Sequence, residues 1–220
     1  MVFEDELGLG GLIFAKIELR RVRALWNRPE KENMKRDLPT AASILRKEEC
    51  VLVILDAQEK LLTAAANRGA TTANLVRLAR FSQIMELPVV VTEHDKMGPT
   101  LEAISGQLSP SLEPIGKKTY DATETMGFEK AVWTHKRQYI VIAGLEAHAA
   151  VMQTAMSCLA NYLVHVVGDA VDSRQAHNRD LALERMRQAG VIITSTEMFI
   201  YELLRESGNA PYRATLPLIK

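Results

Sequence analysis

The chain has 220 residues, and its 27 lysines and arginines balance 27 aspartates and glutamates, so the formal net charge at pH 7 is zero. This balance disfavours nucleic acid and anionic membranes as partners, and an aromatic fraction of 5% argues against a base-stacking surface. No apolar run approaches the roughly 20 residues that span a bilayer, and two cysteines argue against a disulfide framework. We therefore expect a soluble, cytoplasmic protein.

Residues 1–45 are predicted to form a separate N-terminal arm or extension. Their first residues include acids and lack a basic n-region, which argues against a signal peptide. Residues 17–26 (IELRRVRALW) are able to form a helix, and residues 27–39 read as a charged linker. We expect one domain to cover residues 46–220, a length that can bury a sizeable core.

From Cys50 onward, strand patterns alternate with helix patterns. The first strand, CVLVILD, is a continuous apolar run of the kind found in strands buried on both faces. Six segments in all are predicted as strands: 50–56, 88–93, 112–116, 138–144, 163–169 and 191–195.

Helices are predicted between these strands. The first has Leu75, Leu78 and Ala79 at helical spacing behind a threonine N-cap, and Pro88 stops it. The predicted helices cover 71–87, 123–136, a segment beginning near Glu146, 178–190 and 196–207.

This alternation implies βαβ units and a parallel sheet covered on both faces. We predict an α/β protein, a three-layer α/β/α fold with a mainly parallel, six-stranded, Rossmann-like sheet. Ligands of such sheets bind outside the carboxyl ends of the strands, where the strand order reverses. We therefore expect the ligand site at the loops that follow the strand ends, after Asp56, Glu93, Gly116, Gly144, Asp169 and Ser195.

Two of these loops hold charged candidates. Asp56 directly follows five apolar residues, so its carboxyl group is expected to be partly desolvated, although it could instead cap a turn or the next helix. Lys117 and Lys118 follow the third strand, where a lysine could pair with Asp56 or stabilise developing negative charge. Alternatively, either lysine is an ordinary surface residue.

A third loop, GLEAHAAV (144–151), joins a strand to a helix. Free backbone N–H groups at a helix N-terminus bind anions and lower the pKa of a thiol placed there. Here, however, the helix opens on Ala149 and Ala150, which have no reactive group. An ordinary strand-to-helix connection would have the same composition.

Metals and nucleotide cofactors receive no support from the sequence. The five histidines show no HxH, HxxxH or HExxH spacing, and neither a GxGxxG after a strand nor a Walker A sequence occurs. His165 alternates with core residues in a strand, and Cys158 lies on an apolar helix face as a small hydrophobe. We therefore expect no metal and no cofactor.

Taken together, these segments resemble the isochorismatase-like cysteine hydrolase family, which includes nicotinamidases and N-carbamoylsarcosine amidohydrolase. The chain is most similar to the bacterial hydrolase branch of unknown substrate, since the DxHxH-type metal cluster of nicotinamidases has no counterpart. Six segments carry the resemblance, in order: VLVILDAQE, VVVTEHDKMGPT, GKKTYDA, VIAGLEAHAAVMQTA, VVGDAVDSR and ERMRQAGVIITSTEMFIYELL.

The resemblance implies roles for several residues. In the family, a cysteine at the elbow attacks an amide or vinyl-ether-type substrate, and an aspartate and a lysine complete a triad. Asp56 matches the aspartate of the triad. Lys117 matches the lysine, because the family has an aromatic residue three positions after it and Tyr120 stands there. Lys118 is the alternative candidate for the lysine. A cis peptide would fall between Leu145 and Glu146, and the backbone N–H groups of Glu146 and Ala150 would form the oxyanion hole.

The nucleophile position is occupied by Ala150, where the family has cysteine, and Ala147 stands where threonine is usual. Isochorismatases themselves can act with a non-cysteine residue here. Alanine therefore excludes a covalent thioester route to amide hydrolysis through this residue but leaves vinyl-ether hydrolysis open.

Three explanations of Ala150 remain open: a natural pseudo-enzyme that binds a small molecule or assembles with other subunits, a deliberate replacement that traps a substrate, and a water-based hydrolysis driven by Asp56 and Lys117. The second departure, at Ala147, favours a natural variant. The resemblance also implies a homo-oligomer with a small-molecule substrate or ligand. We expect four residues to line its pocket: Gln58, Glu93, His94 and Tyr120.

Overall fold

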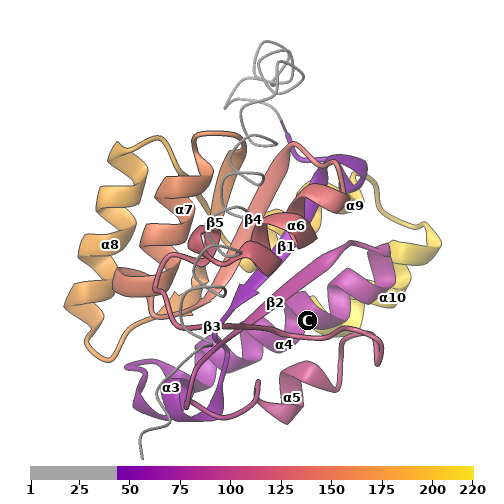
Figure 1. The fold of residues 1–220 in the computed structure, drawn as a ribbon. Helices are drawn as coiled ribbons and strands as arrows, with labels where there is room; N and C mark the ends of the chain where they lie inside the picture. Colours follow the sequence, from indigo (N-terminus) through magenta and orange to yellow (C-terminus); the bar gives the residue numbers. More distant parts are fainter. Residues whose placement is uncertain (1–43) are drawn as a thin grey trace, which may run out of the picture. The chain divides into compact units, whose positions relative to one another are not determined.

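The computed structural model describes residues 44–220 (Figure 1), so the prediction for residues 1–43 of the arm lies outside the described residues. The core of the fold is a six-stranded, fully parallel sheet in the order β3-β2-β1-β4-β5-β6. Its strands are β1 (Cys50–Leu55), β2 (Val89–His94), β3 (Ile115–Lys117), β4 (Tyr139–Leu145), β5 (Leu163–Asp172) and β6 (Ile192–Thr194).

Helices cover both faces of this sheet, which gives three layers and confirms the predicted α/β/α fold. One face carries α4 (Arg68–Met85), α9 (Thr196–Leu204) and α10 (Ala210–Ile219). The other face carries α6 (Met126–Thr134), α7 (Met152–Cys158) and α8 (Ala176–Gln188). Short helices α3 (Glu59–Ala64) and α5 (Glu102–Ser105) lie in the connections after β1 and β2.

The strands form because their apolar side chains are buried on both faces. Every residue of β1 and β4 is buried. On the α4 and α9 side, Leu52 and Ile54 of β1 belong to the main core together with the edge-to-face pair Phe81 and Phe199, whose ring centroids lie 6.0 Å apart. Burial of such aliphatic and aromatic side chains provides most of the favourable free energy of folding.

Two helical predictions differ from the structure. The helix expected over 123–136 is divided into a 3-10 turn (Ala122–Glu124) and α6, and the helix expected from Glu146 begins as a π turn (Ala147–Val151) before α7. Helix α10 was not predicted, although Asn209 caps it by accepting a hydrogen bond from Tyr212 N (2.8 Å) and Pro211 lies in its first turn. Among the described residues, no helix is long and apolar enough to cross a membrane.

His165 lies in β5 and confirms the prediction of a buried histidine, with only 3% of its surface exposed. Its ring packs edge-on against Tyr139, at a centroid distance of 5.7 Å. Among the described residues, neither of its ring nitrogens has a hydrogen-bond partner. Burial lowers the pKa of His165 from 6.5 to about 4, because the imidazolium ion would lose its hydration.

This histidine should make stability depend on pH. Below about pH 6.5 the unfolded chain takes up a proton at His165 and the folded chain does not, so stability falls as the pH drops toward about 4. The full effect is about 3 kcal/mol. Urea unfolding of the unaltered chain and of His165→Leu at pH 7.5 and pH 4.5 would measure this effect. Carboxyl groups titrate in both proteins, so their contribution cancels in the comparison and the difference reports His165. An equal loss in the two proteins would contradict the prediction.

Candidate active site

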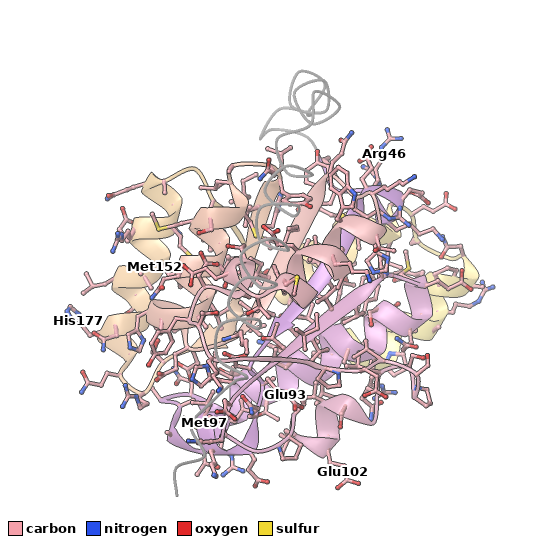
Figure 2. All side chains as sticks on the ribbon, viewed as in Figure 1. Arg46, Glu93, Met97, Glu102, Met152 and His177 are labelled. Atoms are coloured by element: carbon pink, nitrogen blue, oxygen red, sulfur yellow. The ribbon has the colours of Figure 1, made fainter. Side chains whose placement is uncertain are left out.

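The strand order reverses between β1 and β4, which are neighbours at the centre of the sheet. Their register pairs Leu55 with Gly144, so Asp56 and the loop after Leu145 leave the sheet at the same edge. Figure 2 shows Glu93, the next to last residue of β2, at this edge as well. The structure therefore brings together the loops after β1, β2 and β4, three of the six that the switch-point rule selected, whereas Asp169 lies within β5.

Asp56 and Lys117 form an ion pair at this edge. The Lys117 Nζ lies 2.6 Å from Asp56 Oδ2, and the two side chains are 0% and 3% exposed. Thr92 Oγ1 donates a hydrogen bond to the other carboxylate oxygen (2.6 Å), and Lys117 Nζ also donates to the Thr119 carbonyl (3.1 Å). Lys118 is exposed, so the pairing distinguishes Lys117 from the fallback lysine.

The backbone at Asp56 is also unusual, because its φ of 51° lies in the left-handed region that non-glycine residues rarely adopt. The main-chain N–H of Asp56 donates to the Thr92 carbonyl (3.0 Å), and its own carbonyl accepts from Gln58 N (2.7 Å). The aspartate is therefore held by both its backbone and its side chain. Such over-determined conformations concentrate at functional sites.

The elbow after β4 contains the expected cis peptide bond between Leu145 and Glu146. The preceding Gly144 has φ = 121°, and a Cβ there would lie 1.9 Å from the Leu55 carbonyl oxygen. After the elbow, the Glu146 carbonyl accepts hydrogen bonds from Ala149 N (3.0 Å) and Val151 N (3.2 Å). Ala150, in the π turn, is only 2% exposed.

Polar side chains directly after β5 contact the other flank of the elbow. The register of β4 and β5 pairs Leu145 with Asp172, which brings the following Arg174 next to Glu146: Arg174 Nε donates to Glu146 Oε1 (2.9 Å). His148 Nδ1 and Ser173 Oγ lie 2.9 Å apart. Asp172 is fully buried and accepts hydrogen bonds from Asn67 N (2.6 Å) and Ser173 N (2.8 Å).

The four residues expected to line a pocket have different surroundings. Gln58 is fully buried, and its side-chain amide bonds to the main chain of His94 at 3.0 and 2.8 Å and to the Gly98 carbonyl. Glu93 Oε1 accepts from Thr100 N (2.6 Å) and Thr100 Oγ1 (2.8 Å). Both side chains thus fix the loop after β2.

The other two form a stacked aromatic pair. The rings of His94 and Tyr120 are nearly parallel, at an angle of 11° and a centroid distance of 5.5 Å, and Tyr120 is 56% exposed. His94 is paired in register with Lys117, so it lies beside the Asp56–Lys117 ion pair on the neighbouring strand. A role of any of these four residues in substrate binding stays a prediction.

Neither natural cysteine supplies a reactive thiol. Burial raises the pKa of Cys50 to about 12 and raises the pKa of Cys158 well above its ordinary value, so both remain protonated near neutral pH. In the part of the chain that the structure describes, no group of three or more histidine, cysteine, aspartate or glutamate side chains is placed to hold a metal ion.

Comparisons with known proteins identify the family. The model of the isochorismatase domain matches residues 50–198, about two thirds of the chain. This chain belongs to the isochorismatase family. The secreted isochorismatase effector Isc1 of Phytophthora sojae is 32% identical over 177 residues, covering 77% of this chain and 84% of that protein. Isochorismatase family protein 1B of Dictyostelium discoideum is 29% identical over 188 residues, covering 79% and 87%.

Two solved structures share the fold of this chain. The MAR1 ribonuclease of Caenorhabditis elegans has a TM-score of 0.76 and 28% identity, covering 80% of this chain and 92% of that one. The YcaC gene product of Escherichia coli, an octameric hydrolase of unknown specificity, has a TM-score of 0.74 and 23% identity, covering 81% and 94%. The resemblance to the family and the predicted fold are therefore confirmed, and the assignment to its bacterial branch stays a prediction.

Two site residues were missed by the sequence reasoning. Thr92 reads as one more β-branched residue of a buried strand, and Arg174 reads as a surface arginine after another strand. Both lie within the segments that carry the family resemblance, which is the signal that could have found them. Their partners, Asp56 and Glu146, become evident only from the register of neighbouring strands.

Proposed function

We propose that this protein is an isochorismatase-family hydrolase scaffold for a small amide or vinyl-ether-type substrate, in which Asp56 and Lys117 are the retained acid–base pair. The observation that carries the proposal is the buried Asp56–Lys117 ion pair. It lies at the carboxyl edge of the sheet, where Asp56 and the elbow leave the neighbouring strands β1 and β4. An ion pair buried away from solvent costs desolvation energy, and such groups concentrate at functional sites.

The chemistry of the proposed site depends on position 150. A methyl group cannot attack a carbonyl carbon, so amide hydrolysis through a thioester at position 150 is absent in the chain with Ala150. A vinyl ether hydrolyses by another route: a proton adds to the double bond, and water then attacks the resulting oxocarbenium carbon. The hydrated intermediate then collapses, which breaks the C–O bond of the ether and releases the alcohol. This route needs an acid and a base but no thiol: the proton that the Asp56–Lys117 pair holds would pass through Asp56 to the double bond, and the pair would recover a proton from the attacking water.

The second candidate function is a non-catalytic binding or assembly protein. It is favoured by two observations: Ala147 and Ala150 are both buried small residues, and each oxygen of the Asp56 carboxylate accepts a hydrogen bond from the protein. Turnover of an isochorismate-like vinyl ether by the natural chain, abolished in Asp56→Asn, would exclude this candidate. Binding of the same compound without turnover would favour it.

We extend the proposal to assembly, location and domain limits. A homo-oligomer is in line with the octameric E. coli relative, and a cytoplasmic location is in line with two free, buried thiols, whereas one relative is named as secreted. The hydrolase domain is proposed to cover residues 46–220, preceded by an arm. Light scattering of the purified chain would test the assembly.

Restoring the thiol tests the proposed site. In Ala150→Cys the new thiol should react with iodoacetamide at pH 7 roughly tenfold faster than an ordinary thiol, since the helix N-terminus and Lys117 favour the thiolate. The matched control is Ala149→Cys, which places a thiol on the adjacent residue. Mass spectrometry would assign the label among Cys50, Cys158 and the new cysteine.

The proposed site would be wrong if the thiol at position 150 were as inert as Cys158 and if no amide or isochorismate-like substrate were turned over. Equal labelling of the two cysteine variants would show that the helix N-terminus acts alone and that Asp56 and Lys117 make no contribution.

A further inference from the structure

The segment after β3 connects the candidate lysine to the helix that follows the elbow. We call residues 118–125 the strap. At its start, the Thr119 carbonyl accepts a hydrogen bond from Lys117 Nζ (3.1 Å). Thr119 Oγ1 in turn donates to the Asp121 carbonyl (2.8 Å), so the strap folds back on itself beside the lysine. The position of the ammonium group thus depends on the position of the strap.

Two side chains of α7 fix the strap. Thr154 Oγ1 accepts a hydrogen bond from Ala122 N (3.0 Å), and both residues are fully buried. Ser157 Oγ donates to Asp121 Oδ2 (2.5 Å) nearer the surface. Asp121 uses its other carboxylate oxygen to accept from Thr123 N (2.9 Å), which fixes the 3-10 turn of the strap.

Thr154 follows Ala150 by four residues, about one helical turn, so both side chains lie on the same side of the helix. One face of this helix therefore holds the nucleophile position and, one turn further on, the acceptor that anchors the strap. From that anchor, contacts run through Ala122 and Thr119 to Lys117, and from Lys117 to Asp56. No other side chain of α7 makes a buried hydrogen bond to the strap among the described residues.

We infer that Thr154 is a positioning residue that holds Lys117 at a fixed place relative to position 150. This inference rests on the proposed function, because it assigns a purpose to the retained lysine. If the Thr154 hydroxyl is removed, the buried Ala122 N–H loses its acceptor and the strap must shift. Asp56 stays in place, held by Thr92, whereas the Lys117 ammonium group loses the fixed Thr119 carbonyl and is no longer held at one place relative to position 150.

The test uses Ala150→Cys as a reporter, since a nearby ammonium group lowers the pKa of a thiol. The thiol pKa is read from the ultraviolet absorbance of the thiolate as the pH is raised. Adding Thr154→Val should raise this pKa and slow iodoacetamide labelling at pH 7 by about three- to tenfold. Adding Thr154→Ser, which keeps the hydroxyl, should restore the original value.

The pH profile separates positioning from a merely structural effect. If only the pKa has changed, the labelling rates of the two proteins should converge near about pH 10, where both thiols are ionised. A gap that persists at every pH would mean altered access to the thiol and would overturn the inference. An unchanged pKa in folded Thr154→Val would overturn it as well.

A second variant covers the case in which Thr154→Val does not fold. Ser157→Ala loosens the strap at its outer attachment and should raise the thiol pKa in the same direction by a smaller amount; no shift would overturn the inference. The proposed function is judged separately, by comparing Ala150→Cys with Ala149→Cys. Absorbance reports the thiol pKa even if the thiol at position 150 is not activated.

Discussion

Replacing Lys117 with methionine is expected to lower the free energy of unfolding by about 3–5 kcal/mol. Methionine fills a similar volume, but it leaves the Asp56 carboxylate buried with only the Thr92 hydroxyl as a partner. A buried charge without its counter-ion retains the full cost of its lost hydration. Urea unfolding at pH 7 of the natural chain and of Lys117→Met would measure the difference.

Two controls make this prediction specific. Lys118→Met removes the adjacent, exposed lysine and should change stability by less than about 0.5 kcal/mol. The double variant Asp56→Asn with Lys117→Met has no buried charge, so it should recover more than half of the loss, as expected for residues that interact directly. A loss below about 1 kcal/mol in Lys117→Met would show that the pair is screened by solvent and would remove the main support for the proposed site.

The fold could be predicted because its signals are local. The run from Cys50 to Leu55 is apolar throughout, and a strand of that kind fits only the interior of a sheet covered on both faces.

Strand ends were harder to predict. The strand predicted over 163–169 continues to Asp172, past Gly168 and Asp169, because a register irregularity against β4 keeps this segment in the sheet. A glycine followed by an aspartate reads locally as a turn.

The candidate site could be predicted only in part. Asp56 and Lys117 were both placed at the carboxyl edge of the sheet, but they are 61 residues apart, and only the strand order brings them within 2.6 Å. Gln58 and Glu93 have side chains suited to binding a ligand. In the structure both side chains bond to residues 94–100, and these contacts come from the path of a segment that is distant in the sequence from Gln58. Their role in ligand binding stays a prediction.

Replacing Gly144 with alanine is expected to cost more than about 4 kcal/mol and to leave little soluble protein, because two independent effects add. The added Cβ would lie 1.9 Å from the Leu55 carbonyl oxygen and 2.7 Å from Leu55 N. Both are backbone atoms of a fully buried strand, so they cannot move to relieve the clash. In addition, φ = 121° is a conformation that only glycine adopts without strain.

Gly69→Ala is the matched control, because Gly69 lies in α4 and a Cβ there has no atom within 4 Å. That change should be neutral or should stabilise the helix by up to about 1 kcal/mol. Soluble yield and urea unfolding would compare the two variants, and a Gly144→Ala protein of natural stability would contradict the approach of β1 and β4. Leu55 precedes Asp56, and Gly144 precedes the cis peptide bond by one residue. The close approach that requires glycine at position 144 is therefore the same approach that places the aspartate beside the elbow.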